Sequence, residues 1–236
     1  MKNSNYNPGG NFTTLIDNQD NSVSSSQFSA IAKKILKPPI EQIGFISNGI
    51  KTDYKLEMMG GEMCVNALRS LGLWIYQTTG DTKLTVESSG TNDLINLEIQ
   101  TWSKIILPRK YTVKKLSKTL KIVLLEGICH FVLENPPLEE KYIRDTLQKL
   151  KKTYSYLIQD YAAIGLMCVD KSRLIPLVEV IPTKTQFFET ACGSGTLAAY
   201  IASNFSLKAW EQPSGSIFIT NHDDNHFYLN GPVEQI

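Results

Sequence analysis

Two short segments of this chain share one pattern, in which a cysteine stands in a turn directly before a stretch with the apolar spacing of a helix. GGEMCVNA surrounds Cys64 and precedes LRSLGLWIY, while ETACGSGT surrounds Cys192 and precedes LAAYIASNF. The two cysteines are 128 residues apart in a chain of 236 residues. This spacing predicts two similar halves that face each other, each with one cysteine at the start of a central helix.

The order of the other elements supports this division. In the first half, a helix over 25–37 is followed by strands over 42–46 and 54–58, and then by the Cys64 turn. In the second half, a strand pair over 120–134 and a helix over 137–156 precede two buried strands and the Cys192 turn. Sequence identity between the halves is low, so the repeat is one of order. We expect the opening residues 6–11 to form a turn.

Composition excludes several classes of protein. With 24 Lys+Arg, 23 Asp+Glu and a sequence pI near 7.6, the chain lacks the basic excess by which proteins hold nucleic acid. The longest apolar stretch, residues 162–169, is far shorter than the ~20 residues of a membrane span. The opening MKNSNYNPGG has no apolar core of a signal peptide. We therefore expect a cytoplasmic protein with reduced thiols, without nucleic-acid or membrane partners.

The spacing of the cysteines argues against a metal site. Successive cysteines are 65, 39 and 24 residues apart, which matches no compact zinc motif, and the three histidines do not complete one. We expect no metal and no other cofactor. Cys129 and Cys168 lie in apolar, strand-like runs, where a free cysteine packs as a small hydrophobic residue.

The positions of Cys64 and Cys192 at the starts of predicted helices indicate a chemical role. The N-terminus of a helix presents unpaired N–H groups and the positive end of the dipole, which lower the pKa of a cysteine and bind a carboxylate. Two such thiols across a cleft form an acid/base pair: one removes a proton from an acidic carbon and the other returns a proton to the opposite face. The product is the inverted stereocentre. The alternative is a redox pair, in which a disulfide would join the halves.

The chain resembles the diaminopimelate epimerase superfamily of cofactor-independent amino-acid racemases. Five segments carry the resemblance in the family's order: NPGGNF at 7–12, EMCVNA at 62–67, ACGSGT at 191–196, QPSGS at 212–216 and NGPVE at 230–234. The resemblance implies an α+β fold of two pseudo-symmetric domains, each a β-barrel-like sheet around a central helix. We expect domain boundaries at 1–108, with 226–236 returning to it, and at 109–225.

The resemblance also implies roles. Cys64 and Cys192 correspond to the catalytic pair, and many members are cytoplasmic homodimers. The residues expected to bind the substrate through side chains or backbone N–H groups are Asn11, Gln42, Val65, Asn66, Ala67, Glu189, Gly193, Ser194 and Gly195.

Two departures from the family pattern narrow the choice of substrate. Ile128 stands where the family has the Asn that grips the far end of diaminopimelate, and the Arg expected to pair with the distal carboxylate is missing before Cys192. A buried carboxylate without a partner is costly, which argues against diaminopimelate. The chain is more similar to the histidine racemases that supply D-histidine for opine-type metallophores. They share the opening Tyr-Asn-Pro-x-Gly-Asn at 6–11 and the Glu-Gln-Ile-Gly-Phe at 41–45. An imidazole would be suited by Glu189 or another polar group, and the alternative role of Glu189 is to orient its helix.

Three alternatives stay open at this point. The substrate could be another amino acid, including diaminopimelate or proline. The chain could be a non-catalytic amino-acid-binding protein of the same fold, although it retains both cysteines. It could belong to the phenazine-type isomerase branch, which has the same fold but lacks the cysteine pair.

Overall fold

A computed structural model describes residues 2–236, within which the chain forms five helices and seventeen strands. The helices are α1 (Ser25–Ile35), α2 (Val65–Thr79), α3 (Glu140–Thr153), α4 (Ser155–Ile158) and α5 (Gly193–Ala202). The strands of the first half are β1 (Asn3–Asn7), β2 (Thr13–Asp17), β3 (Gln42–Asn48), β4 (Tyr54–Met58), β5 (Lys83–Ser88), β6 (Ile95–Ile99) and β7 (Ser103–Pro108). The remaining strands are β8 (Thr112–Lys115), β9 (Leu120–Leu125), β10 (Ile128–Glu134), β11 (Ala163–Asp170), β12 (Arg173–Val180), β13 (Thr185–Phe188), β14 (Ala209–Glu211), β15 (Ile217–His222), β16 (His226–Gly231) and β17 (Glu234–Gln235). The fold is therefore α+β and rich in sheet.

The strand pairings occur in the same order in both parts of the chain. β1 and β2 are antiparallel, β2 and β3 parallel across α1, and β3 and β4 antiparallel. Likewise, β9 and β10 are antiparallel, β10 and β11 parallel across α3 and α4, and β11 and β12 antiparallel. Each series continues through a short parallel contact, β4 with β5 and β12 with β14. The end of the chain returns to the first half, because β16 pairs with β7 and β17 with β1.

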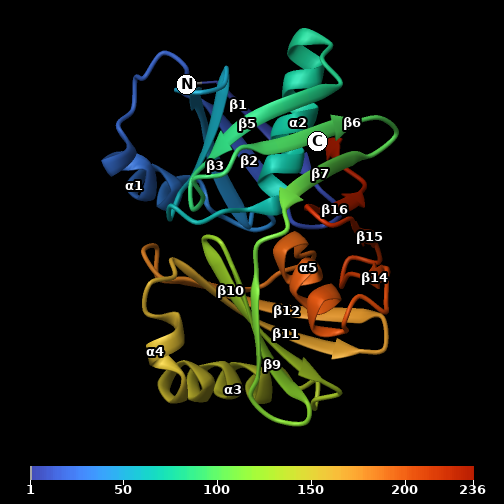
Figure 1. Cartoon of the computed structure of the whole chain (residues 1–236). Helices are drawn as coiled ribbons and strands as arrows, with labels where there is room; N and C mark the ends of the chain where they lie inside the picture. Colours follow the sequence, from blue (N-terminus) through green and yellow to red (C-terminus); the bar gives the residue numbers. More distant parts are fainter. Residues whose placement is uncertain (1) are drawn as a thin grey trace.

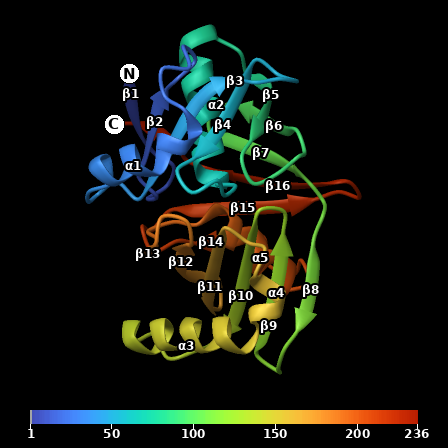
Figure 2. The same cartoon turned by 90° about the vertical axis from the view of Figure 1, so that its left-hand side faces the viewer.

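Figure 1 shows α2 among the strands of the upper part and α5 among those of the lower part. In Figure 2, β15 and β16 run across the molecule between the two parts. The N-termini of α2 and α5 thus both lie towards the middle of the molecule. No helix within residues 2–236 is long and apolar enough to cross a membrane.

The two central helices are buried for reasons visible in their sequences. Leu68, Leu71 and Ile75 follow the 3–4 residue spacing of one helix face and are fully buried. α2 ends where Gly80 adopts a left-handed conformation with φ +83°, which glycine enters at no steric cost. In α5, every residue from Gly193 to Ala202 is buried, consistent with its nearly continuous run of small and apolar side chains.

The strand under α5 separates two layers of the core. Alternate side chains of a strand point to opposite faces, so Ala163 and Met167 of β11 lie on the α5 side, whereas Leu166 and Cys168 pack with α3 on the other side. The lower part is thus a sheet with α5 on one face and α3 on the other, as Figure 2 shows for α3.

Most elements expected from the sequence are present, including both helices that follow a cysteine. The prediction that residues 6–11 form a turn is wrong at its start, because Asn3–Asn7 is the strand β1, which pairs with β2 and β17. Its residues are too polar to show a strand pattern, and one of its partners, β17, lies at the other end of the chain.

Candidate active site

Cys64 and Cys192 occupy equivalent positions in the two central helices. Each is the N-cap residue, with an extended backbone, and each sulfur accepts a hydrogen bond from a backbone N–H three residues later. The donors are Ala67 N at 3.5 Å and Gly195 N at 3.3 Å. The sulfurs therefore satisfy N–H groups that a helix leaves without an internal partner.

The two helix ends meet directly. Asn66 Nδ2 donates to Ala191 O at 3.1 Å, which links the start of α2 to the residue before Cys192. Gly193 allows this approach, because a Cβ added there would lie 2.5 Å from Val65 Cγ1. Both cysteines consequently line one cavity of about 20 Å³, with room for about one water. A substrate of amino-acid size enters only when the cavity walls separate.

Nine of the predicted site residues contribute to this cavity. They are Asn11, Gln42, Cys64, Val65, Asn66, Glu189, Cys192, Gly193 and Ser194. Ala67 and Gly195, which were expected to bind the substrate, do not line it. Their N–H groups are instead directed at the cysteine sulfurs. The N–H groups at the first two positions of each helix, Val65 and Asn66 in α2 and Gly193 and Ser194 in α5, are left for a carboxylate.

Asn66 and Asn11, which line the cavity, belong to one chain of hydrogen bonds. Asn66 Nδ2 also donates to Asn11 Oδ1 at 3.3 Å, and Asn11 Nδ2 donates to Glu41 Oε2 at 2.7 Å. Asn66 Oδ1 accepts from Arg69 Nη1 at 3.0 Å, and burial lowers the pKa of Arg69 to about 9. The side-chain amide of Asn66 is thus fully engaged with protein groups, which gives it a connecting role between the two helix ends.

The predicted lowering of the cysteine pKa values is wrong for the protein without a substrate. Cys64 is half-buried and lines the cavity, and desolvation of its sulfur is the largest cause that raises its pKa, with the charge of Glu189 next. Desolvation also raises the pKa of Cys192, followed by the charge of Glu189 and its hydrogen bond to this thiol. The N–H groups of Ala67 and Gly195 act in the opposite direction but are outweighed. Both cysteines are therefore thiols in this state.

Glu189 lies between the predicted substrate residue Gln42 and Cys192. Gln42 Nε2 donates to Glu189 Oε1 at 2.9 Å. Burial raises the pKa of Glu189 to about 8, while hydrogen bonds from Cys192 and Gln42 oppose the shift. A carboxyl group with a pKa near neutrality is suited to exchange a proton with a neighbouring thiol.

His130, to which the sequence analysis gave no role, is linked to Cys192 through Ser194. His130 Nε2 lies 3.0 Å from Ser194 Oγ, which lies 3.8 Å from Cys192 Sγ. Strand alternation turns His130 of β10 towards α5 and its neighbour Cys129 towards α3. Burial lowers the pKa of His130 to about 3, so the ring is neutral and its N–H can hold the serine hydroxyl. In the sequence, the only indication of this contact was the alternation of side chains along the strand, which places His130 and Cys129 on opposite faces.

The other cysteines are packing residues, as predicted. Cys129 and Cys168 are fully buried in the layer under α3, and burial raises the pKa of each to about 12. All four cysteines of the chain are free.

Sequence reasoning also missed Glu62, whose buried side chain lines the cavity. The remaining walls are apolar and comprise Met63, Ile128, Ala163, Val178 and Val180. The two glycines before Glu62 marked a turn in the sequence, but nothing in that pattern indicated which way the carboxylate would point.

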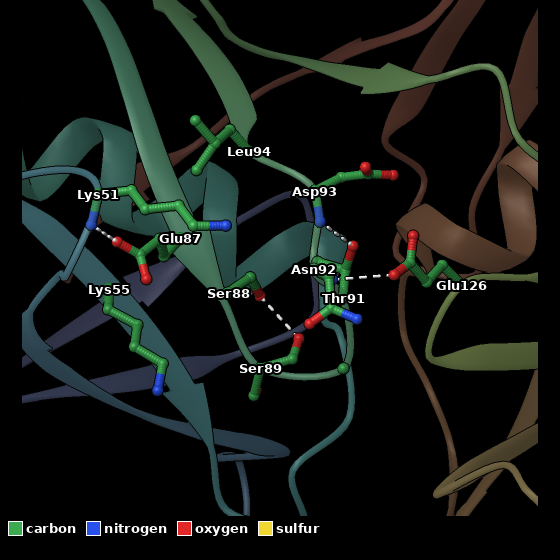
Figure 3. A pocket seen from close by; sticks show the side chains of 11 residues that line it. Lys51, Lys55, Glu87, Ser88, Ser89, Thr91, Asn92, Asp93, Leu94 and Glu126 are labelled. Carbon is green, nitrogen blue, oxygen red and sulfur yellow. Dashed lines mark hydrogen bonds between the residues drawn. The ribbon is translucent and has the colours of Figure 1, made fainter.

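A larger hollow of about 450 Å³ lies elsewhere and has no cysteine in its lining. Figure 3 shows its polar walls, where Asn92 N donates to Glu126 Oε1 at 2.9 Å. Because neither Cys64 nor Cys192 lines it, the cysteine cavity is the stronger candidate for an active site.

With this geometry established, comparison with known proteins identifies the family. The family model described as the histidine racemase CntK N-terminal domain matches residues 1–233. The chain belongs to the histidine racemase family. A curated histidine racemase from Fusobacterium nucleatum subsp. nucleatum is 30% identical, over 97% of this chain and 92% of the relative. A histidine racemase from Staphylococcus aureus is 27% identical, over 92% of this chain and 87% of the relative.

Solved structures agree on the fold. A structure titled as a predicted epimerase from Pseudomonas aeruginosa has a TM-score of 0.69 at 11% identity, with 99% of this chain and 96% of that chain covered. A phenazine biosynthesis protein of the PhzF family from Bacillus anthracis has a TM-score of 0.64 at 13% identity, with coverages of 100% and 98%. At these identities the likeness concerns the fold alone. The family match confirms the resemblance to histidine racemases drawn from the sequence motifs.

Proposed function

We propose that this chain interconverts L- and D-histidine, with Cys64 and Cys192 as the paired acid and base and with no cofactor. The observation that carries the proposal is the meeting of two helix N-termini, each with a cysteine at its cap, around one cavity. Membership of the histidine racemase family and the names of the relatives support histidine as the substrate.

In this mechanism the substrate carboxylate binds the N–H groups at the starts of α2 and α5. These groups also stabilise the negative charge that develops when the α-hydrogen leaves as a proton. One cysteine, as thiolate, forms an S–H bond with that proton while the C–H bond breaks. The other cysteine then gives its thiol proton to the opposite face of the same carbon. The thiolate and the thiol have exchanged places, and the configuration is inverted.

The raised pKa values require a source for the thiolate. Glu189 supplies a base for Cys192: its carboxylate, whose charge raises the pKa of this thiol, takes the thiol proton. The substrate's ammonium group brings a positive charge into a cavity that holds Glu62 and Glu189, which favours the thiolate. Ser194, held by His130, donates a hydrogen bond to the sulfur as its charge forms.

We propose the domain organisation from the order of the strand pairings. The repeated order of strand pairings and the return of β16 and β17 support two pseudo-symmetric, barrel-like domains, 1–108 with 226–236 and 109–225. We also propose, from the family resemblance, a cytoplasmic homodimer whose D-histidine is used for an opine-type metallophore.

The test is incubation of the purified protein with L-histidine, followed by chiral chromatography. We expect D-histidine to accumulate until the enantiomers are equal, and we expect Cys64→Ser and Cys192→Ser each to abolish the reaction. Cys129→Ser is the matched control, because its sulfur lies in the layer under α3. Failure of the wild-type protein to racemise histidine would refute the substrate, and an active single variant of either paired cysteine would refute the mechanism.

A further inference from the structure

The unsatisfied side-chain polar atoms of the residues that line the cysteine cavity are hydrogen-bond acceptors. Among residues 2–236, buried side-chain atoms without a hydrogen-bond partner include Glu62 Oε1, Glu62 Oε2 and Gln42 Oε1. All three belong to residues that line the cavity. Because a buried polar atom without a partner is costly, a ligand that complements this cavity brings N–H or O–H donors.

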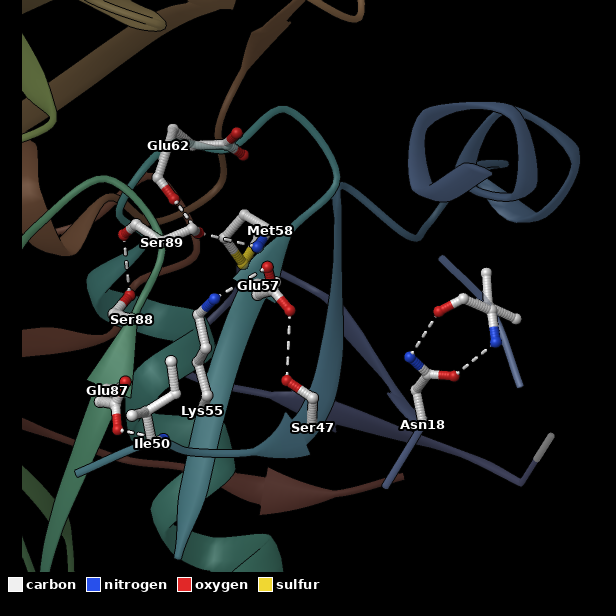
Figure 4. A network of polar contacts seen from close by, with 11 residues as sticks. Asn18, Ser47, Ile50, Lys55, Glu57, Met58, Glu62, Glu87, Ser88 and Ser89 are labelled. Atoms are coloured by element: carbon white, nitrogen blue, oxygen red, sulfur yellow. Dashed lines mark hydrogen bonds and ion pairs between the residues drawn. The ribbon is translucent and has the colours of Figure 1, made fainter. Parts of the chain in front are cut away.

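Ser89 holds the backbone at Glu62 and leaves the carboxylate without a partner. Ser89 Oγ donates to Glu62 O at 2.7 Å and accepts from Met58 N at 2.9 Å, as Figure 4 shows, with the carboxylate pointing away from Ser89. Gly60 leaves room for it, since a Cβ there would lie 2.6 Å from Glu62 Oε2. The side chain is only 3% exposed. The local structure thus fixes the backbone at Glu62, and its buried carboxylate has no hydrogen-bond partner within the folded protein.

Burial raises the pKa of Glu62 to about 7, and the backbone N–H groups of Glu62 and Gly60 reduce the shift only in part, since neither makes a hydrogen bond of normal geometry. Glu189, the other carboxylate of the cavity, already accepts a hydrogen bond from Gln42 Nε2 at its Oε1. Of these two acidic side chains, Glu62 is therefore the one whose oxygens are free to bind a ligand.

We propose that Glu62 is the residue that selects the substrate's side chain. Its carboxylate accepts a charge-assisted hydrogen bond from a ring N–H of histidine. The proposal rests on the proposed racemase function and assigns this selection to Glu62 in place of Glu189. The apolar side chains of Met63, Ile128 and Val178 line the same cavity and provide apolar contacts for the ring. An aliphatic amino acid of similar size leaves both carboxylate oxygens unsatisfied and is rejected.

The first test compares L-histidine with its two ring-N-methylated isomers on the wild-type protein, which avoids any question of folding. Racemisation rates are measured by chiral chromatography over a range of substrate concentrations. We expect one isomer, the one methylated on the nitrogen that faces Glu62, to lose binding by about 10- to 100-fold, because a hydrogen bond to a charged group contributes about 1.5–3 kcal/mol. Equal KM values for histidine and both isomers would overturn the proposal.

The second test uses Glu62→Gln. We expect KM for L-histidine to rise by about 10- to 100-fold, with a smaller change in kcat, because Glu62 does not touch the reacting carbon. The ¹³C shifts of bound L-histidine provide a readout independent of rate: the imidazole pKa is raised in the wild-type complex and returns to its ordinary value in Glu62→Gln. Glu57→Gln is the matched control, since Glu57 is paired with Lys55 on β4 outside the cavity.

The outcomes separate this proposal from the proposed function. If the wild-type protein does not racemise histidine, the function itself fails. If it does, and Glu62→Gln keeps the wild-type KM and the same bound imidazole pKa, only the role of Glu62 is overturned.

Discussion

Replacing Gly193 by alanine separates the two helix ends on which the mechanism depends. The added Cβ would lie 2.5 Å from Val65 Cγ1 and 2.9 Å from Asn66 Oδ1. Carbon atoms in contact prefer about 3.5–4.0 Å, so the start of α2 must move away by about 1 Å. Since Cys64 and Cys192 are the caps of these helices, the two thiols move apart with them.

The expected effect is large on catalysis and moderate on stability. A misplacement of 1 Å costs about 100-fold in rate when two groups must act on one atom. Overpacking of a buried contact costs about 1–3 kcal/mol in the free energy of unfolding. We therefore expect Gly193→Ala to fold and to racemise histidine about 100-fold more slowly. Removing Val65 Cγ1 with Val65→Ala in the same chain should restore part of the rate.

The assay is chiral chromatography of the reaction together with urea unfolding of each variant. Gly80→Ala is the matched control at the other end of α2. Gly80 has φ +83° and no heavy atom within 4 Å of the site of a Cβ. Alanine there costs about 1–2 kcal/mol through its left-handed backbone but leaves the cavity unchanged. A Gly193→Ala variant with the wild-type rate, or a Gly80→Ala variant as slow as Gly193→Ala, would refute the reasoning.

Other substitutions test neighbouring parts of the account. The folded state raises the pKa of Glu189 from about 4.5 to about 8, so it binds the proton more tightly than the unfolded state. Stability should fall as pH rises from 4.5 to 8, by roughly 1.4 kcal/mol per unit of pKa shift, and urea unfolding of Glu189→Gln should show a smaller fall, with the part due to Glu62 remaining below pH 7. An unchanged slope would contradict the assignment. Ser194→Ala should lower kcat by about tenfold, since it removes one hydrogen bond to the Cys192 sulfur; an unchanged kcat would show that the His130–Ser194 contact is structural. Cys129→Ala should retain the wild-type kcat, and its loss would show that this cysteine is more than a packing residue.

The sequence was sufficient to predict the parts of the fold that depend on local pattern. The apolar spacing after Cys64 and Cys192 predicted α2 and α5, and the polar turn residues before them predicted where the helices begin. The strand β1 escaped because Asn3–Asn7 is polar and is stabilised by partners at both ends of the chain. Pairings of this kind depend on contacts that no window of sequence contains.

The site was predictable in its residue types but not in its electrostatics. Nine predicted residues meet at one cavity because each lies in or beside a motif at a helix start or at a strand end. The predicted direction of the cysteine pKa shifts was wrong, because the prediction considered only the local effect of the helix N-terminus. Desolvation of the thiols and the charge of Glu189 depend on how the folded chain surrounds the two sulfurs. Glu62 and His130 were missed for a related reason, since the inward direction of a side chain is set by the fold.

The most direct measurement of the central claim is the position of deuterium early in the reaction of L-histidine in D₂O, followed by NMR and mass spectrometry of the separated enantiomers. Two cysteines on opposite faces predict that the first D-histidine formed carries deuterium at the α-carbon, while the remaining L-histidine retains its original hydrogen. D-histidine that keeps the original α-hydrogen, or L-histidine that gains deuterium as fast as the product does, would contradict the paired-cysteine mechanism.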